Sequence, residues 1–145
     1  MVWYVGAPAS NYALKGYSTF TSDNKTRTPM IYVGGNDGML HGFSAADGSE
    51  KIAYVPQGVI PSLTRLTNPT YNQKHRFFVD GSPMTGDVDM GAGVQDPDAP
   101  NYDPTYSPTW RTLLVGTLGA GGKGYFVLDV TDPNAFLEAN ASTLV

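Results

Sequence analysis

The sequence predicts an all-β chain of short antiparallel strands joined by tight turns. Two observations lead to this prediction: short apolar runs are separated by Gly and Asp, and helix-forming charged residues are scarce. Charged residues make up 15% of the 145 residues, and every acidic residue except Glu50 and Glu138 is aspartate. Asp, Gly and Pro favour turns, whereas Glu, Lys and Arg populate helix surfaces. The composition therefore excludes a helical bundle, and the net charge of −4 excludes a basic nucleic-acid binder.

The first half of the chain predicts a strand, a polar loop and a meander. Residues 2–5 form the first apolar run, and residues 7–28 are polar and predict a loop. Three further strands are predicted at residues 30–33, 39–44 and 51–55. The turns between them contain Asn36-Asp37-Gly38 and Asp47-Gly48, residue types that accept the positive φ of tight hairpin turns.

The second half predicts strands separated by two long excursions. Residues 56–75 form a connection with at most one short helix near residues 63–66, and residues 91–109 form a Pro- and Asp-rich excursion. Strands are predicted at residues 76–79, 84–90, 110–118 and 125–130, with a Gly-rich turn at 119–124. A short terminal helix is predicted to start at Asp132.

An internal repeat indicates that the predicted all-β chain is part of a β-propeller. Residues 27–47 resemble residues 110–132, and their spacing without the two excursions is close to the roughly 40–45 residues of a propeller blade. The apolar runs at 113–115 and 125–128 are continuous, which indicates sheets covered on both faces. Two units are fewer than the roughly 4–8 blades of a closed propeller. We therefore predict a fragment of about two blades, with boundaries at about 1–56 for blade one, 57–75 for the linker, 76–133 for blade two and 134–145 for the start of the next segment.

Two acidic pairs are candidate calcium ligands. Asp87, Asp89, Asp96 and Asp98 are closely spaced, and Ca²⁺ binds carboxylate oxygens. Gly91 and Pro100 stand where each pair would need a further oxygen ligand, so a solvated acidic excursion is the preferred interpretation over a metal site.

Aromatic residues around the second excursion are candidate ligand contacts. Tyr102, Tyr106 and Trp110 could stack on a sugar, although packing at a strand end is the preferred interpretation. His41 and His75 are the only imidazoles, and His41 is expected to be a packed or hydrogen-bonded residue of a strand rather than a general base. Neither a thiol nucleophile nor an acid–base carboxylate pair is visible, so we predict no enzyme and no cofactor in this segment. Glycines 119, 121 and 124 fit a dinucleotide fingerprint, but a strand follows them where that fingerprint needs a helix.

Three motifs resemble the C-terminal β-propeller of the PilC/PilY family of type IV pilus tip-associated adhesins. They are Tyr-Val-Gly-Gly-Asn-Asp-Gly-Met-Leu-His-Gly-Phe at 32–43, Val-Asp-Gly-Ser-Pro at 79–83, and the run from Trp110 to Pro133. The resemblance covers nearly the whole chain. It implies a bacterial cell-surface protein at the pilus tip or outer membrane, secreted through the periplasm, which supports pilus assembly, twitching motility and adhesion.

The resemblance also implies partners and a cofactor of the full-length proteins. The implied partners are minor pilins at the pilus tip and a host or abiotic surface. The family binds calcium, which we expect elsewhere in the full domain rather than in this segment. No nucleic acid and no membrane span are expected, because no apolar run is long enough to cross a bilayer. A fragment of a propeller is expected to self-associate or to need the remaining blades.

Two other functions remain open. The Gly-x-Asp-Gly turns are also similar to the repeats of quinoprotein dehydrogenases, which suggests a propeller enzyme. A carbohydrate-binding β module that uses the 91–109 loop is a third interpretation.

Overall fold

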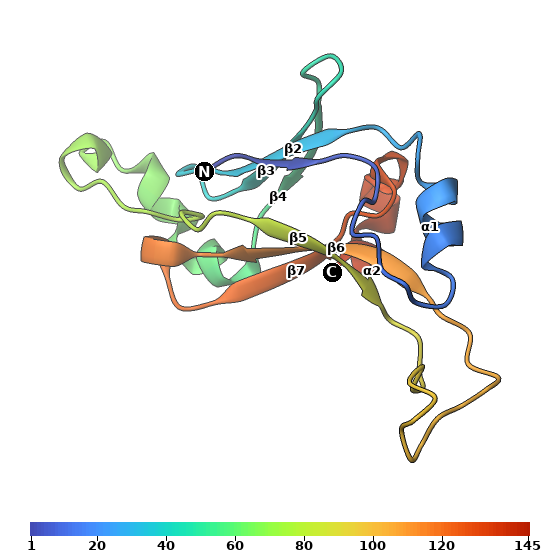
Figure 1. The fold of residues 1–145 in the computed structure, drawn as a ribbon. Coiled ribbons are helices and arrows are strands. Elements are labelled where there is room, and N and C mark those ends of the chain that lie inside the picture. The colour runs from blue at the N-terminus through green and yellow to red at the C-terminus, as the bar shows by residue number, and fades with distance from the viewer.

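The computed structural model describes residues 1–145 as two antiparallel sheets that face each other (Figure 1). The first sheet has the order β1-β2-β3-β4, and the second has the order β5-β6-β7. Their bounds are β1 (Trp3–Val5), β2 (Met30–Gly34), β3 (Leu40–Ser44), β4 (Glu50–Tyr54), β5 (Met84–Asp89), β6 (Trp110–Thr117) and β7 (Tyr125–Asp129). The prediction of an all-β chain is confirmed. No helix has the length and apolar character needed to cross a membrane.

Short local signals position the strands of the first sheet. Gly38 and Gly48 adopt φ values of 96° and 73° in the turns that follow β2 and β3. Residues other than Gly, Asn and Asp seldom adopt such φ values, so these turns depend on the Asp-Gly pairs. The pairing of β3 with β4 is irregular between Gly42 and Phe43, where the register shifts.

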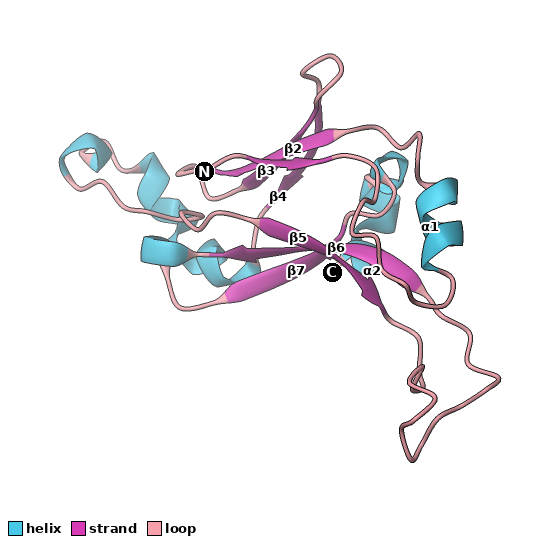
Figure 2. Ribbon diagram, in the orientation of Figure 1, coloured by secondary structure: helices cyan, strands magenta, loops and turns pink.

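The chain also forms short helices that the strand prediction did not contain (Figure 2). The prediction that residues 7–28 are only a loop is wrong, because α1 (Tyr17–Asp23) lies within them. Tyr17 and Phe20 of α1 are buried against Trp110 of β6. This contact with a distant strand, rather than helix propensity, accounts for the helix. The remaining helical turns are η1 (Gln57–Thr67), η2 (Tyr71–Gln73), η3 (Gly119–Gly121), η4 (Pro133–Ala135), η5 (Glu138–Asn140) and α2 (Ala141–Leu144).

The predicted strand at residues 76–79 is also wrong, because this segment pairs with no strand. Phe78 and Val79 are nevertheless each only 1% exposed. The Val79 N–H donates to the Gly35 carbonyl oxygen at 3.3 Å, which attaches the segment to the end of β2. The segment is apolar because it fills the core at the end of the sheets, and core filling and strand pairing leave the same local pattern.

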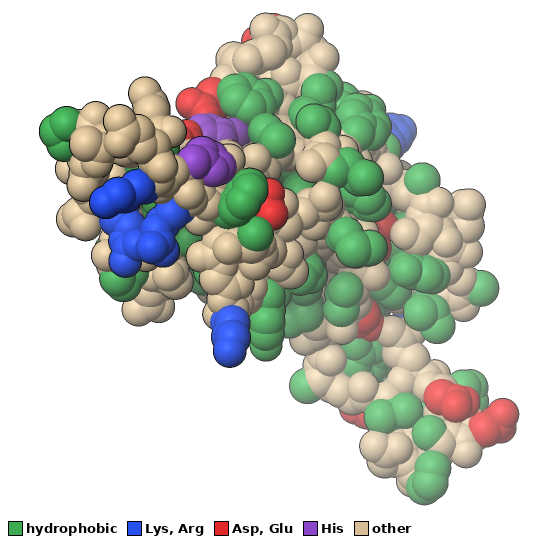
Figure 3. Space-filling model, turned by 90° about the vertical axis from the view of Figure 1, so that its left-hand side faces the viewer, with side chains coloured by type: hydrophobic (Ala, Val, Ile, Leu, Met, Phe, Trp, Pro, Cys, Tyr) green, Lys and Arg blue, Asp and Glu red, His purple; other side chains and the backbone are tan.

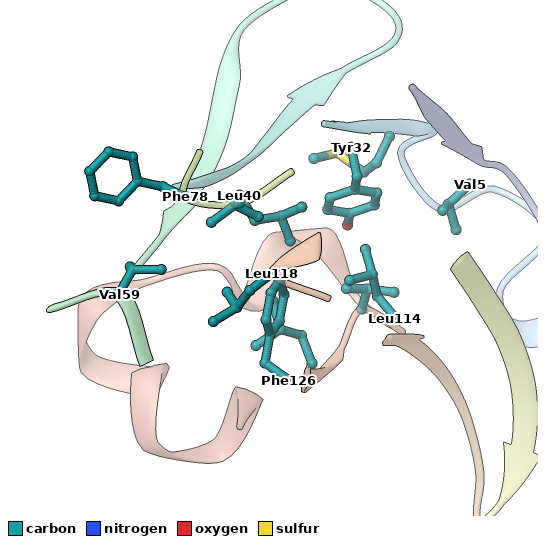
Figure 4. Close-up of a cluster of buried hydrophobic side chains, with 12 residues drawn as sticks. Val5, Tyr32, Leu40, Val59, Phe78, Leu114, Leu118 and Phe126 are labelled. Carbon is teal, nitrogen blue, oxygen red and sulfur yellow. The ribbon is translucent and has the colours of Figure 1, made fainter. Parts of the chain in front are cut away.

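A single main core lies between the two sheets (Figure 4). Tyr32 and Leu40 of the first sheet and Leu114 and Leu128 of the second are at most 1% exposed. Gly116 makes room for the Phe126 ring, since a Cβ at Gly116 would lie 2.2 Å from Phe126 Cζ. Val59 of η1 and Phe78 complete the core from the connecting segment.

The outer face of the second sheet is uncovered and carries an apolar patch beside the Arg111–Asp129 ion pair. Met84, Val115 and Val127 lie side by side across β5, β6 and β7. Met84 is 61% exposed and Val115 42% exposed. The continuous apolar runs of β6 and β7 therefore have one face in the core and one face without a neighbour in this chain.

Candidate functional site

The 91–109 excursion leaves the sheet after β5 and returns to it at β6, and the Asp89 carboxylate holds its two ends together. Asp89 Oδ1 accepts hydrogen bonds from the backbone N–H of Gly91 at 3.0 Å and of Thr109 at 2.8 Å. Asp89 Oδ2 accepts from the Tyr106 hydroxyl at 2.5 Å and from the Gln95 amide. Both oxygens are therefore occupied by donors from the loop.

These contacts favour the ionised form of Asp89. Burial opposes ionisation, but the hydrogen bonds from Tyr106, Gly91, Thr109 and Gln95 outweigh it and lower the Asp89 pKa. The same hydrogen bond to Asp89, with a smaller effect of burial, raises the Tyr106 pKa. The pair is thus a carboxylate–phenol contact at the base of the loop.

Asp87, on the same face of β5, belongs to a polar network that joins the two sheets. Its carboxylate accepts from the hydroxyls of Tyr17 at 2.6 Å and Thr112 at 2.7 Å. Thr112 Oγ1 in turn accepts from Arg27 Nη1 at 2.8 Å, and Arg27 Nε donates to the Gly6 carbonyl oxygen at 2.7 Å. Burial lowers the Arg27 pKa and the charge of Asp87 opposes that shift. Arg27 therefore links the end of β1 to the second sheet.

The candidate calcium ligands do not fit a calcium ion in this arrangement. Asp96 Oδ1 caps the turn to the Asp98 N–H at 3.0 Å. The carboxylates of Asp87 and Asp89 point to hydroxyl and N–H donors, which occupy the lone pairs that a cation would need. No three His, Cys, Asp or Glu side chains in the chain are grouped to hold a metal ion.

The three candidate aromatic residues differ in exposure. Trp110 is 8% exposed and Tyr106 is 4% exposed, whereas Tyr102 is 43% exposed. Trp110 stacks on Tyr12 at 5.7 Å between ring centroids and meets the Tyr17 ring edge-on at 4.8 Å. Of the three candidates, only Tyr102 presents a substantial aromatic surface to solvent.

A hollow of about 470 Å³ lies beside Tyr102, between the loop and the segment that precedes α1. Leu14, which is 50% exposed, lines the opposite wall. Lys15 fixes that wall to the loop, because its backbone N–H donates to Gln95 Oε1 at 3.0 Å and its ammonium group donates to the Tyr106 carbonyl oxygen. The hollow is therefore formed by two segments that lie far apart in the sequence.

Sequence reasoning missed a second polar cluster, in the first sheet. His41 of β3 contacts Asp37 Oδ2 through Nε2 at 2.8 Å and Glu50 Oε1 through Nδ1 at 2.6 Å. The hydrogen bond to Glu50 raises the His41 pKa, burial opposes it, and the bond to Asp37 adds to the rise. The register of the β3–β4 hairpin could have revealed this cluster, because it brings the start of β4 beside β3. The cluster stabilises the β2–β3 and β3–β4 turns together.

Comparisons with known proteins identify relatives of the chain. The PilY1 beta-propeller domain family matches residues 2–145. A type IV pilus biogenesis factor PilY1 of Pseudomonas aeruginosa is 47% identical over 118 residues, which cover 81% of this chain and 9% of that protein. A PilY1 homolog of Xylella fastidiosa is 41% identical over 138 residues, which cover 90% of this chain and 10% of that protein.

A solved structure shows the same similarity in three dimensions. The crystal structure of the Pseudomonas aeruginosa PilY1 C-terminal domain matches with a TM-score of 0.54 and 38% identity, over 90% of this chain and 23% of that chain. These matches confirm the prediction of a partial β-propeller. The chain spans about a tenth of the length of the curated relatives that it matches.

Proposed function

The chain belongs to the PilY1 β-propeller family, and we propose that it is a non-enzymatic structural and adhesive module of a type IV pilus biogenesis factor. Its place is the bacterial surface, at the pilus tip or outer membrane, after passage through the periplasm. Its partners are minor pilins and a host or abiotic surface. The segment uses no cofactor, and any calcium of the protein binds outside it.

The anchored 91–109 loop is the observation that carries this proposal. Loops on rigid sheets are common binding surfaces, because the scaffold fixes their position while their sequence varies. Asp89 closes the base of this loop, and Tyr102 lines the hollow of about 470 Å³ at its side. The role is therefore binding by a positioned loop, without covalent chemistry.

We further propose that each sheet is one blade of a larger propeller. The outer face of the second sheet, with Met84 and Val115, is the surface on which a neighbouring blade would pack. β7 is also an edge strand of a sheet that has one strand fewer than the four of a complete blade. Both features would be covered in a longer chain, and they would promote self-association of this segment alone.

An attachment assay tests the adhesive role. Bacteria that carry Tyr102→Ala in the full protein are expected to assemble pili normally and to lose surface attachment, because the change removes exposed aromatic surface from the loop and leaves the core untouched. Tyr4→Ala is the matched control, since Tyr4 is 63% exposed on β1. Attachment that is equal in the two variants would refute the role of the loop. Glycan-array binding that is lost with Tyr102→Ala would identify a carbohydrate as the ligand.

Light scattering tests the blade proposal. The isolated 145-residue chain is expected to self-associate, and Val115→Lys is expected to shift it toward the monomer by placing a charge on the uncovered apolar face. Thr26→Lys adds the same charge at an exposed position off the sheets and should have no effect. A monodisperse, stable wild-type monomer would contradict the proposal.

A further inference from the structure

A basic lobe stands at one end of the acidic protein. The lobe consists of η1, η2 and the residues that follow them, 57–76. Arg65, Lys74 and Arg76 surround a hollow of about 350 Å³ in it, together with Asn68 and Tyr71. Figure 3 shows Lys and Arg side chains gathered on this part of the surface. The net charge of −4 conceals this local excess of positive charge.

The three cationic side chains have no anionic partner within the chain. The ion pairs of the protein join His41 to Asp37 and Glu50, and Arg111 to Asp129. Residues 51–79 contain neither Asp nor Glu, so no carboxylate of the lobe can neutralise it. Cations that converge without a counter-charge repel one another, and an anion that enters the hollow relieves this repulsion.

The hollow offers hydrogen-bond donors on a fixed frame. Asn68 Oδ1 accepts from the backbone N–H of Thr70 at 2.9 Å and from its hydroxyl at 2.8 Å, so the side-chain oxygen of Asn68 is already engaged and its NH₂ group remains as a donor. The Tyr71 hydroxyl donates to the Arg76 carbonyl oxygen at 3.2 Å, and the Lys74 N–H donates to the Tyr71 carbonyl oxygen at 2.8 Å. These hydrogen bonds hold the backbone of residues 68–76 in place around the hollow.

The lobe is also attached to the core. Val59 at the start of η1 is 2% exposed, and Leu63, Leu66 and Tyr71 pack against the main core cluster. An anion site on such a support needs little reorganisation when it binds, because the backbone that carries its donors is already held in place.

We propose that this hollow binds a tetrahedral oxyanion, as a phosphate or sulfate monoester on a soluble ligand such as a sugar. Two guanidinium groups and one ammonium group offer more donors than a single carboxylate can accept, whereas phosphate and sulfate present three or four oxygens. A concave site takes one such group at a time, which favours a soluble ester over a membrane surface. The site lies outside the 91–109 loop, and its test does not depend on a role in pili.

Titrations followed by NMR test the site on the ¹⁵N-labelled chain that carries Val115→Lys, the change expected to suppress its self-association. Sodium phosphate and sodium sulfate are added separately at constant ionic strength, with sodium acetate as the carboxylate probe. We expect saturable shifts at residues 65–76 with phosphate and sulfate, and binding about tenfold weaker with acetate. Shifts that are equal for all three salts, or that do not saturate, would overturn the proposal, because they would reflect screening rather than a site.

Variants locate the site. Arg65→Gln and Arg76→Gln are each expected to weaken phosphate binding about five- to tenfold, since each removes one charge-assisted contact. Lys123→Gln removes an exposed cation elsewhere and should leave binding unchanged. Both arginines are exposed, so the variants should keep the wild-type circular dichroism spectrum and melting temperature. Phosphate affinity that is unchanged in the Arg65→Gln, Arg76→Gln double variant would refute the site.

Two further probes identify the source of the oxyanion. Glucose 6-phosphate should compete with inorganic phosphate for the same residues, whereas vesicles of phosphatidylglycerol should bind no better than neutral phosphatidylcholine vesicles. Vesicle binding that depends on Arg65 and Arg76, without binding of glucose 6-phosphate, would overturn the assignment to a soluble ester.

Discussion

Replacing Asp89 by Asn should loosen the 91–109 loop while leaving both sheets intact. The side chain keeps its size but loses its charge and one acceptor oxygen. If the remaining oxygen continues to accept from the N–H groups of Gly91 and Thr109, the new NH₂ group faces the donors of Tyr106 and Gln95. The Tyr106 hydroxyl can rotate to accept, whereas the Gln95 NH₂ group cannot.

The expected loss of stability follows from the contacts that change. A hydrogen bond to a charged group contributes about 1.5–3 kcal/mol when it is buried. The bond from Gln95 is lost, and the bond from Tyr106 becomes one between two neutral groups. Asp89 is partly exposed, so solvent screening reduces the total loss of stability. We therefore expect the free energy of unfolding to fall by about 2 kcal/mol.

The pH dependence of this loss has a defined direction. The folded-state pKa of Asp89 lies below its usual value of 3.8. The wild-type advantage is therefore fully present above about pH 4 and is lost as the pH falls through the folded-state pKa. The Asn variant has no such titration, so the two proteins should converge in stability in acid.

Urea unfolding gives the stability difference, and hydrogen exchange gives its location. Exchange should accelerate for the amides of residues 91–109 and stay slow in β6. Asp96→Asn is the matched control, because the Asp96 side chain only caps an exposed turn to the Asp98 N–H. Equal stability of wild type and Asp89→Asn at neutral pH, or equal losses in the two variants, would refute the role of Asp89 as the anchor of the loop.

Three further variants test the contacts within and between the sheets. Arg27→Met should lower the free energy of unfolding by about 2 kcal/mol in urea, because it removes a partly buried cation that joins the two sheets. His41→Gln should cost about 1 kcal/mol near pH 6. Because the His41 pKa is raised above 6.5, that cost is present below the unfolded value and disappears as the pH rises through the folded one. Gly116→Ala should cost about 1–3 kcal/mol by forcing a methyl group into the Phe126 ring, whereas Gly86→Ala, which meets nothing within 4 Å, should cost nothing.

Each of these variants has an outcome that contradicts its reasoning. An Arg27→Met protein as stable as wild type would show that the polar network does not hold the sheets together. A His41→Gln cost that stays constant across the titration of the imidazole would remove its charge from the argument. Equal stability of the two glycine variants would show that the core relaxes around the added methyl group at Gly116.

The strands could be predicted from the sequence because their signals are local. Every strand of the structure coincides with a segment predicted as a strand, including β5, in which polar and apolar residues alternate. The turns at Gly38 and Gly48 carry the residues that positive φ requires. The segment at 76–79 has the same apolar pattern and forms no strand. Its apolar residues fill the core, and only the tertiary structure distinguishes that use from pairing in a sheet.

The features that sequence reasoning missed depend on contacts between distant residues. Helix α1 is held by the contacts of Tyr17 and Phe20 with Trp110, and its seven residues are too few to give a clear helical pattern in the sequence. Asp89 was considered as a metal ligand because it lies close in sequence to other aspartates, whereas its actual partners Tyr106 and Thr109 lie across a long excursion. The basic hollow was missed because the composition of the whole chain is acidic, although the absence of acidic residues between 51 and 79 was a visible signal.

Strand β5 explains how one small scaffold can present two surfaces of opposite charge. The basic lobe precedes its first residue, Met84, and the acidic 91–109 loop follows its last residue, Asp89, so they lie toward opposite ends of the strand (Figure 1). The six residues of β5 span about 20 Å. A ligand of sugar size cannot span that distance. The two surfaces would therefore bind independently, and a phosphate or sulfate ester at the lobe should leave the exposure of Tyr102 unchanged. Loss of attachment in Tyr102→Ala together with unchanged phosphate binding would demonstrate this independence, whereas phosphate binding that falls with Tyr102→Ala would show that the rigid strand does not insulate the two surfaces.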